Sequence, residues 1–230
     1  MENRKLWNEL YKEARHRIKY PAENVIRFVR KNFICNGKEK ILDLGCGAGR
    51  HVIYLADTNI VPYGGDFSAS GVAYTKDILE QLDYSQFVGN IIETTTYNLP
   101  FEDDYFDGLI CWGVLYYMDK THIKESVREI YRVLKKNALA LVLIRTVEDY
   151  RCQDAKRRGA KEVEERTFML EEHETAKSAA KEDGMLMHFF TRDEVQELFA
   201  DFSEITVDTV TQTHENGSYQ DQDFLITLKK

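Results

Sequence analysis

The chain has 230 residues, of which 43% are apolar, enough for one large hydrophobic core or two small ones. It carries 31 Lys and Arg against 39 Asp and Glu, and this net charge of -8 disfavours a protein that grips nucleic-acid phosphates. No run of about 18 apolar residues is present, and the N-terminus has no apolar signal-peptide segment. We therefore expect a cytoplasmic protein with neither a nucleic-acid nor a membrane partner.

The chain contains four cysteines, Cys35, Cys46, Cys111 and Cys152. None forms a Cys-x-x-Cys pair, and no histidine cluster has the spacing of a zinc site. We therefore expect reduced, structural thiols and no bound metal.

Residues 1–33 are predicted to be helical, because Trp7, Leu10 and Tyr11 recur near helical spacing. Pro21 is expected to break this helical region. The segment would then form an N-terminal helical cap, with Trp7 packed in the core.

Short apolar runs alternate with longer helical patterns through the middle of the chain. The predicted strands are Lys40–Leu44, Val61–Asp66, Gln86–Gly89, Phe106–Cys111 and Ala138–Arg145. The predicted helices are Arg50–Asp57, Ala69–Leu82 and Thr121–Lys135, and Asn137 is expected to end the last one. Such apolar runs are typical of strands buried on both faces, and their alternation with helices indicates βαβ units. We predict an α/β fold with a doubly wound, mostly parallel sheet and helices on both faces.

Residues 147–183 depart from this pattern, because they are rich in charged side chains and poor in apolar ones. One interpretation is a solvated helical insertion. The other is a helical lid over a substrate, since the segment follows the fifth predicted strand of a sheet of this type.

Two further strands, Glu204–Thr213 and Phe224–Lys229, are predicted near the C-terminus. The sequence Asn216-Gly217 between them is a strong turn signal. We expect an antiparallel hairpin that closes the sheet, and a single domain over residues 1–230.

The stretch from Ile41 to Arg50 reads as a strand, a glycine-rich turn and the start of a helix. Glycines allow a tight turn and let a ligand approach the peptide N–H groups without a Cβ in the way. The spacing is Gly-x-Gly-x-Gly, whereas the dinucleotide fingerprint places its third glycine one residue later. This spacing disfavours a nucleotide-dependent oxidoreductase.

An acidic residue, Asp66, ends the next predicted strand, 21 residues after Gly45. A carboxylate at this strand end can accept hydrogen bonds from both ribose hydroxyls of an adenosine. The alternative role for Asp66 is to cap the helix that begins at Ala69, but Ser68 is better placed for that.

The run Asp43–Arg50 resembles the first motif of the class I S-adenosylmethionine-dependent methyltransferases, and Gly65–Ser68 resembles the second. Further segments follow in the order expected for that family: Leu99–Asp107, Cys111–Tyr117 and Glu129–Lys135. The resemblance implies a Rossmann-like sheet of seven strands with S-adenosyl-L-methionine as cofactor and S-adenosyl-L-homocysteine as product. It says little about the substrate.

The resemblance also implies which residues surround the cofactor. Asp66 would hold the ribose, Phe67 would lie against the adenine, and Trp112 with Gly113 would face the methionine end. The full set is Tyr11, Tyr20, Asp43, Gly45, Cys46, Gly47, Gly49, Asp66, Phe67, Ser68, Thr95, Thr96, Trp112 and Gly113. The chain departs from the family at Thr95, where an acidic residue usually lies near the adenine amino group.

A sulfonium methyl group is already activated, so the protein must align a nucleophile with the S–CH₃ bond, and no general base is demanded. The substrate-side candidates are Tyr117, Arg145 and His188. Tyr117 and Arg145 stand near carboxyl ends of predicted strands, where open α/β sheets bind ligands, and Arg145 could hold an anion bidentately. Packing for Tyr117 and His188, and solvation for Arg145, are the alternatives.

The leading hypothesis is a methyltransferase for a small molecule, such as a sugar, a sugar phosphate or another anionic metabolite, acting as a monomer or homodimer. The alternative is a non-catalytic S-adenosylmethionine-binding regulatory or partner protein. A methyltransferase for RNA is disfavoured by the acidic charge balance.

Overall fold

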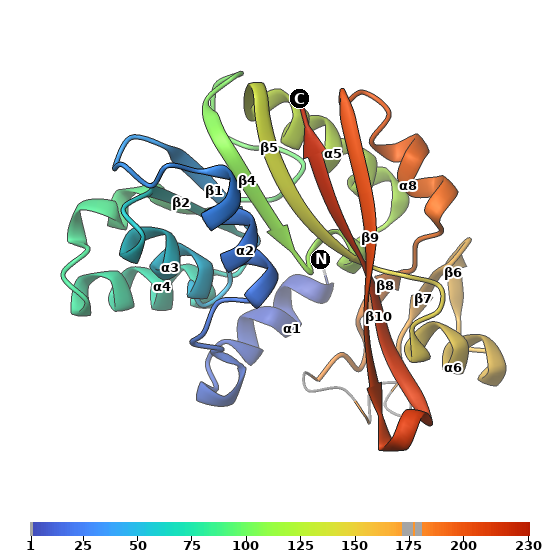
Figure 1. Ribbon diagram of the computed structural model, residues 1–230. Coiled ribbons are helices and arrows are strands. Elements are labelled where there is room, and N and C mark those ends of the chain that lie inside the picture. The colour runs from blue at the N-terminus through green and yellow to red at the C-terminus, as the bar shows by residue number, and fades with distance from the viewer. Residues whose placement is uncertain (1, 172–176, 178–180) are drawn as a thin grey trace.

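The computed structural model describes residues 2–171, 177 and 181–230 of the chain (Figure 1). Its main element is a sheet in which the described strands follow the order β3-β2-β1-β4-β5-β10-β9. These strands are β1 (Lys40–Leu44), β2 (Val61–Asp66), β3 (Ile91–Glu93), β4 (Phe106–Trp112), β5 (Leu134–Arg145), β9 (Glu204–His214) and β10 (Tyr219–Lys229). Strands β1 to β5 pair in parallel, whereas β10 runs antiparallel to both β5 and β9. The predicted doubly wound sheet with an antiparallel hairpin is confirmed.

Helices cover both faces of this sheet. They are α1 (Glu2–Leu10), α2 (Glu23–Asn32), α3 (Arg50–Asp57), α4 (Ala69–Gln81), α5 (Lys120–Val133) and α8 (Arg192–Leu198). On one face Phe28 of α2 and Leu55 of α3 are buried against Ile41. On the other face Ile130 of α5 packs with Leu42. Successive strand residues point to opposite faces, which explains why neighbours in β1 join different cores.

The N-terminal segment is helical, as predicted. α1 is followed by the 3₁₀ turn η1 (Ala14–His16), and α2 begins at Glu23, shortly after the predicted break at Pro21. Figure 1 shows α1 near the carboxyl end of β4, and Asn3 of α1 donates a hydrogen bond to the backbone of Tyr117, which follows that end. The segment therefore covers that end of the sheet.

The third strand was predicted too early, by five residues at its start and four at its end. Gln86–Gly89 lies in the 3₁₀ helix η2 (Ser85–Asn90), and β3 follows it. Ile91 is fully buried and pairs with Gly64 of β2, whereas Phe87 is only partly buried. Pairing with β2 therefore decides the strand, which apolar composition alone could not show.

The junction between α5 and β5 also differs from the prediction. β5 begins at Leu134, so the predicted helix end at Lys135 and strand start at Ala138 are wrong. Asn137 lies inside β5 with a φ of 64° and does not end α5. Leu134 is fully buried, so the core extends the strand toward the helix.

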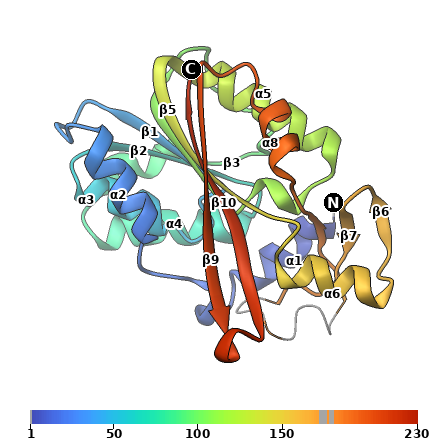
Figure 2. The ribbon, with the colours of Figure 1, turned by 45° about the vertical axis from the view of Figure 1, so that its right-hand side comes forward.

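The C-terminal hairpin is longer than predicted. β10 begins at Tyr219, opposite His214, rather than at Phe224. β5 ends at Arg145, opposite Asp223, so the part of the hairpin beyond that pair projects past β5 (Figure 2). The projecting end forms a wall beside the carboxyl ends of the parallel strands.

The charged segment 147–183 is only partly helical. α6 (Tyr150–Arg158) is followed by β6 (Glu162–Glu164) and β7 (Thr167–Met169), and β7 pairs with β8 (Leu186–His188). The prediction of a helical insertion is therefore wrong beyond α6, because β7 buries its side chains against a strand distant in sequence. Residues 172–176 and 178–180 lie outside the described part of the chain, and the lid stays a prediction.

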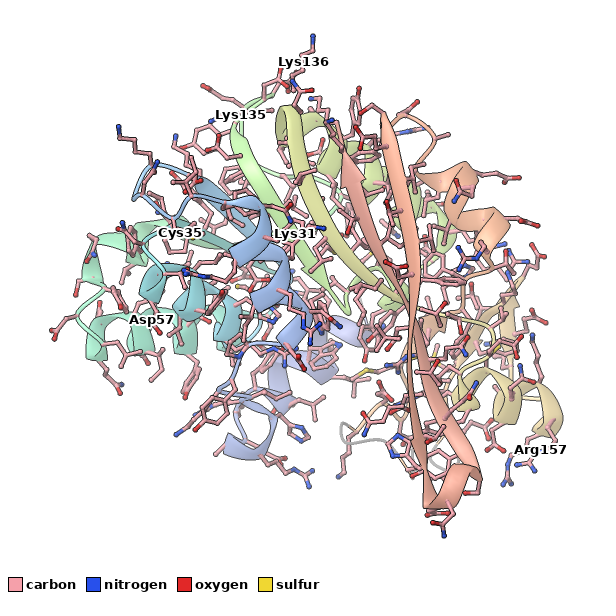
Figure 3. All side chains as sticks on the ribbon, viewed as in Figure 1. Lys31, Cys35, Asp57, Lys135, Lys136 and Arg157 are labelled. Atoms are coloured by element: carbon pink, nitrogen blue, oxygen red, sulfur yellow. The ribbon has the colours of Figure 1, made fainter. Side chains whose placement is uncertain are left out.

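Charged side chains such as Lys31, Asp57 and Lys136 are exposed and point away from the sheet (Figure 3). Among the described residues no helix is long and apolar enough to cross a membrane. Over the same residues, no group of three or more His, Cys, Asp or Glu side chains is arranged to hold a metal ion.

Candidate functional site

A tight turn joins β1 to α3. Gly45, Gly47 and Gly49 adopt positive φ angles of 78°, 51° and 81°, which other residues rarely adopt. All three are also crowded: an added Cβ would lie 2.2 Å from Cγ2 of Val114 at Gly45, 2.3 Å from the Tyr11 hydroxyl at Gly47 and 2.6 Å from Cγ2 of Thr75 at Gly49. Glycine is therefore required here for both conformation and space.

The peptide N–H groups of this turn are largely engaged within the protein. The N–H groups of Gly45 and Cys46 both donate to the carbonyl oxygen of Gly65, at 2.7 and 3.1 Å, which ties the turn to the end of β2. The N–H of Gly47 donates to Asp66. These amides stabilise the turn, so the expectation that they are open to a ligand is wrong for these three residues.

Asp66 lies at the end of β2 with only 6% of its surface exposed. Its Oδ2 accepts the N–H of Gly47 at 2.8 Å, and its Oδ1 accepts the N–H of Ser68 at 2.7 Å. Burial raises the pKa of Asp66 to about 6, although these backbone hydrogen bonds oppose the rise. Ser68 instead caps α4 by accepting the N–H of Gly71, which confirms the assignment of the cap to Ser68.

Asp43 lies beneath the turn and is 1% exposed. Its Oδ1 is 3.4 Å from Nδ1 of His51, whereas its Oδ2 has no hydrogen-bond partner among the described residues. His51 in turn contacts the edge of Trp112, with ring centroids 6.1 Å apart. A buried carboxylate oxygen without a hydrogen-bond partner is unusual. It marks this turn as a place where a polar group of a ligand can bind.

A cavity of about 1170 Å³ opens in front of this turn. Eleven of the predicted site residues line it: Tyr11, Gly45, Cys46, Asp66, Phe67, Thr95, Thr96, Trp112, Gly113, Tyr117 and Arg145. Four others lie directly behind them, in β1, in the turn or at the start of α4: Asp43, Gly47, Gly49 and Ser68. The structure therefore brings most of the predicted site residues together around one cavity, from β1, β2, β4 and β5 and from the loops that follow these strands and α1.

A smaller recess of about 330 Å³ adjoins this cavity beside Phe67 and Thr95. Glu93, at the end of β3, lines this recess and is ion-paired with Arg4 of α1. The family usually has an acidic residue at the position of Thr95. In this chain Glu93, two residues earlier in the sequence, is an acidic residue close to that position. Thr96 has its hydroxyl 2.6 Å from that of Ser126 in α5.

Helix α1 forms the roof of the cavity. Trp7 stacks on Tyr11 and meets Tyr117 edge to face, with centroids 5.4 and 5.2 Å apart. The side chain of Asn3 donates to the carbonyl oxygens of Tyr117 and Leu186 and accepts the N–H of Leu186. The roof is therefore fastened both to the 3₁₀ turn that follows β4 and to β8. Burial raises the pKa of Tyr11 well above its ordinary value, so its hydroxyl stays protonated.

Two predicted residues lie outside the cavity lining. Tyr20 is 81% exposed, because the chain between η1 and α2 runs along the surface. His188 is fully buried in β8, where its ring nitrogens contact the Thr167 hydroxyl at 2.7 Å and Glu194 at 3.0 Å. These partners hold His188 inside the core, which weakens its predicted role on the substrate side.

Tyr117 and Arg145 line the cavity, and most of their polar atoms are engaged, although Nη1 of Arg145 has no hydrogen-bond partner among the described residues. The Tyr117 hydroxyl donates to Oε1 of Glu182 at 2.7 Å. Arg145 lies within 3.2 to 3.6 Å of three carboxylates, those of Asp223, Asp149 and Glu182. The guanidinium charge is thus compensated by the protein, which weakens the expected role of Arg145 as an anion site.

Sequence reasoning missed the contribution of the C-terminal hairpin. Val210, Gln212, Asp221 and Asp223 line the cavity. The signal that could have found them is alternation along the strands, combined with their place beside the carboxyl end of β5.

Residues 41–137, which hold the glycine turn, Asp66 and Trp112, match a protein family described as a methyltransferase domain. This match and the order of the strands support a class I S-adenosylmethionine-dependent methyltransferase domain over this segment. It is 39% identical over 106 residues to a 2-phytyl-1,4-naphtoquinone methyltransferase of Trichormus variabilis, covering 44% of each chain. It is 29% identical over 114 residues to the uncharacterized methyltransferase YcgJ of Bacillus subtilis, covering 47% of this chain and 42% of that one. The matches thus span less than half the length of these relatives.

Solved methyltransferase structures share the fold over nearly the whole chain. A methyltransferase from Methanosarcina mazei superposes with a TM-score of 0.67 and 20% identity, over 88% of this chain and 96% of the other. One from Archaeoglobus fulgidus gives a TM-score of 0.64 and 13% identity, over 98% of both chains. At these identities the likeness shows the fold alone.

The residues of this site fit the cofactor of the class I methyltransferases, S-adenosylmethionine. Asp66 is a buried carboxylate that faces the cavity, and the unpartnered Oδ2 of Asp43 lies under the turn where the methionine end is expected. Phe67 offers an apolar ring next to the recess that holds Glu93. The crowded glycines keep that part of the cavity free of side chains other than those of α1 and Val114.

Proposed function

We propose that this methyltransferase domain transfers a methyl group from S-adenosylmethionine to a small-molecule acceptor. The observation that carries the proposal is one continuous cavity, lined on one side by the cofactor residues of β1, β2 and β4 and on the other by the C-terminal hairpin. When bound, S-adenosylmethionine supplies an activated methyl group on a sulfonium sulfur.

The chain's own residues bind, orient and exclude water. Asp66 would hold the ribose, and Trp112 with Gly113 would border the reacting end. The roof formed by Trp7 and Tyr11 covers the site from solvent. Because the reaction is a displacement that depends on alignment, such positioning can contribute about 7–11 kcal/mol in favourable cases.

The identity of the acceptor is the finer part of the proposal. The naphthoquinone methyltransferases share the matched segment with this chain, and the family match ends at residue 137, before β10 and the hairpin wall. Their acceptor is therefore one candidate, a ring that could pack against Trp112 and Tyr116. A sugar phosphate or other anion has less support, since Arg145 already contacts three carboxylates.

The alternative, a non-catalytic S-adenosylmethionine-binding protein, has less support than an enzyme. A cavity of about 1170 Å³ exceeds the roughly 300–1,000 Å³ typical of a site for one ligand. The volume beside the hairpin is therefore available to a second molecule.

Calorimetric titration with S-adenosylhomocysteine and with NAD tests the cofactor assignment. We expect micromolar binding of S-adenosylhomocysteine and none of NAD. A turnover screen against pooled metabolites, read as S-adenosylhomocysteine release, then tests the activity. Binding of NAD alone would overturn the assignment, and cofactor binding without turnover of any pool would favour the non-catalytic alternative.

A further inference from the structure

One face of the sheet continues from the cofactor site into the hairpin. Leu143 pairs with Trp112 of β4, and Arg145, two residues later on the same face of β5, pairs with Asp223 of β10. Asp223 in turn pairs with Val210 of β9. Paired residues share a face, and so do residues two apart in a strand. All five line the cavity, so the face leads from the predicted reacting end to the hairpin.

Most of this face lies outside residues 41–137, the segment that matches the methyltransferase domain family. β4 belongs to the matched range 41–137, but the cavity-lining parts of β5, β9 and β10 follow it. The cofactor half and the hairpin half of the cavity are therefore separable in sequence. Specificity for the acceptor is expected in the second half.

Asp223 is the carboxylate on this face with an available oxygen. Its Oδ1 accepts a hydrogen bond from Nε of Arg145 at 3.2 Å, and among the described residues no hydrogen bond is found for its Oδ2. The side chain is 14% exposed. Asp221, by contrast, uses Oδ1 for Arg151 and Oδ2 for His214, at 3.1 and 3.0 Å. Asp66 is held by two backbone N–H groups.

The charges around Asp223 are unbalanced toward the negative. Two guanidiniums, those of Arg145 and Arg151, contact four carboxylates in one cluster of ion pairs. The carboxylates are those of Asp149, Glu182, Asp221 and Asp223. Among these six side chains the carboxylates outnumber the guanidiniums by two, and His214 also contacts Asp221. An anionic acceptor would be repelled here, whereas a group that donates a hydrogen bond would be favoured.

Aromatic rings form the walls next to this carboxylate. The Tyr116 ring lies 4.9 Å from the guanidinium carbon of Arg145, and its hydroxyl is 2.9 Å from where a Cβ of Gly113 would be. Trp112 lies on the same sheet face, two strands away on β4. An acceptor seated here would therefore contact both flat apolar rings and one polar oxygen.

We propose that Asp223 determines acceptor specificity by accepting a hydrogen bond on Oδ2 from the nucleophilic hydroxyl or amine of a non-anionic acceptor. The inference rests on the proposed methyltransferase function and names the acceptor class for that same cavity. The acceptor oxygen or nitrogen forms a bond to the methyl carbon while the carbon–sulfur bond breaks and its electron pair stays on sulfur. The proton released by the acceptor passes to Oδ2 of Asp223. Burial raises the pKa of Asp223, which makes the carboxylate a better proton acceptor.

The test uses four small probes, each with one aromatic ring and a different polar group: 4-ethylphenol, 2-phenylethylamine, phenylacetate and phenyl phosphate. The chain has two tryptophans, Trp7 and Trp112, and both line the cavity, so their fluorescence reports its occupancy. Each probe is titrated into protein saturated with S-adenosylhomocysteine. We expect the phenol or the amine to bind at least tenfold more tightly than the two anions, and the better of the two identifies the acceptor atom.

The variant that tests the residue is Asp223→Asn, with Asp208→Asn as the matched control. Asp208→Asn is the same substitution on the same hairpin, but Asp208 is exposed and does not line the cavity. We expect Asp223→Asn to weaken the favoured probe at least tenfold while the affinity for S-adenosylhomocysteine changes less than twofold. The control should bind both like wild type.

A second variant keeps the test decisive if Asp223→Asn does not fold. Val210→Phe places a larger side chain in the cavity beside Asp223, with which Val210 pairs, and does not change the charge. We expect it to weaken binding of the probe but not of S-adenosylhomocysteine. The inference is overturned if the anions bind as well as the phenol and amine, if no probe binds, or if Asp223→Asn binds the probe like wild type. Failure of the wild type to bind S-adenosylhomocysteine would instead overturn the proposed function.

Discussion

The hydroxyl of Tyr11 lies directly over Gly47, where an added Cβ would be only 2.3 Å from the hydroxyl oxygen. Tyr11 directly follows the first helix and Gly47 is in the turn after the first strand, so the contact joins the roof of the cavity to its floor. The N–H of Gly47 also donates to Asp66. One glycine therefore connects the N-terminal segment, the turn and the acidic end of β2.

Substitution of Gly47 by alanine is expected to disrupt both the turn and the roof. The added methyl group would clash with Tyr11 and would require a φ of 51°, which costs about 1–2 kcal/mol for a residue with a Cβ. We expect Gly47→Ala to lower S-adenosylhomocysteine affinity at least tenfold in calorimetry. Adding Tyr11→Ala should restore part of the lost thermal stability, since it removes the clash but not the backbone strain. Equal melting temperatures for the single and double variants would contradict this contact.

Cofactor binding is expected to depend on pH through Asp66, whose pKa is raised by burial to about 6 from an ordinary value of 3.8. Ribose hydroxyls favour the ionised carboxylate, so S-adenosylhomocysteine affinity should rise from pH 5 to pH 7 and then level off. At pH 5 about a tenth of the carboxylate is ionised, which predicts roughly tenfold weaker binding. Calorimetry across this range measures the profile, and Asp66→Asn should bind more weakly with no such slope.

The stability of the unliganded protein should respond to Asp66 in the opposite sense. A carboxyl group whose pKa is raised by folding binds more protons in the folded state, so stability falls as pH rises from about 4 through 6. Asp66→Asn should remove that part of the decline in thermal melts. If the affinity of the wild type for S-adenosylhomocysteine does not change from pH 5 to pH 7, Asp66 does not contact the cofactor.

The cofactor half of the site could be predicted because its residues are adjacent in sequence. The turn at residues 45–49 needs glycine for its own conformation, and Asp66 follows a strand whose pattern is local. The carboxyl ends of neighbouring parallel strands meet at one edge, so a correct order of strands brings these residues together. No knowledge of distant contacts is needed for that step.

The substrate half could not be predicted, because it depends on pairing between distant strands. Asp223 lines the cavity because the register of β10 places it opposite Arg145. The third strand forms at Ile91–Glu93 and not at Gln86–Gly89, because Ile91 pairs with β2. His188 has the composition of a candidate site residue, yet its hydrogen bonds to Thr167 and Glu194 place it in the core. Such partners are visible only in the fold.

The Asn3 side chain is expected to hold the roof in place. It makes three hydrogen bonds of 2.8 to 3.0 Å to the backbone of Tyr117 and Leu186 while 7% exposed. Loss of one partner of a buried hydrogen bond costs about 1–3 kcal/mol. We expect Asn3→Ala to speed hydrogen exchange at the Leu186 amide about tenfold or more and to weaken S-adenosylhomocysteine binding. Lys5→Ala, an exposed change in the same helix, serves as the control, and an unchanged Leu186 exchange rate in Asn3→Ala would show that α1 is held elsewhere.

His188 is expected to stabilise the fold without acting in the reaction. Burial raises the pKa of its partner Glu194, but the hydrogen bond from His188 and the charges of His188 and Arg166 outweigh it, so that pKa is lowered overall. A lowered carboxyl pKa stabilises the folded state above the unfolded value of about 4.5, and this contribution is lost as pH falls. His188→Gln should therefore reduce the free energy of unfolding by about 1–3 kcal/mol at pH 7, with a smaller difference from wild type below about pH 4.5. Its affinity for S-adenosylhomocysteine should stay within twofold of wild type, as should that of Glu194→Gln, because neither residue lines the cavity. Denaturant unfolding at several pH values, together with calorimetry, checks both parts, and a loss of cofactor affinity at full stability would return His188 to the active site.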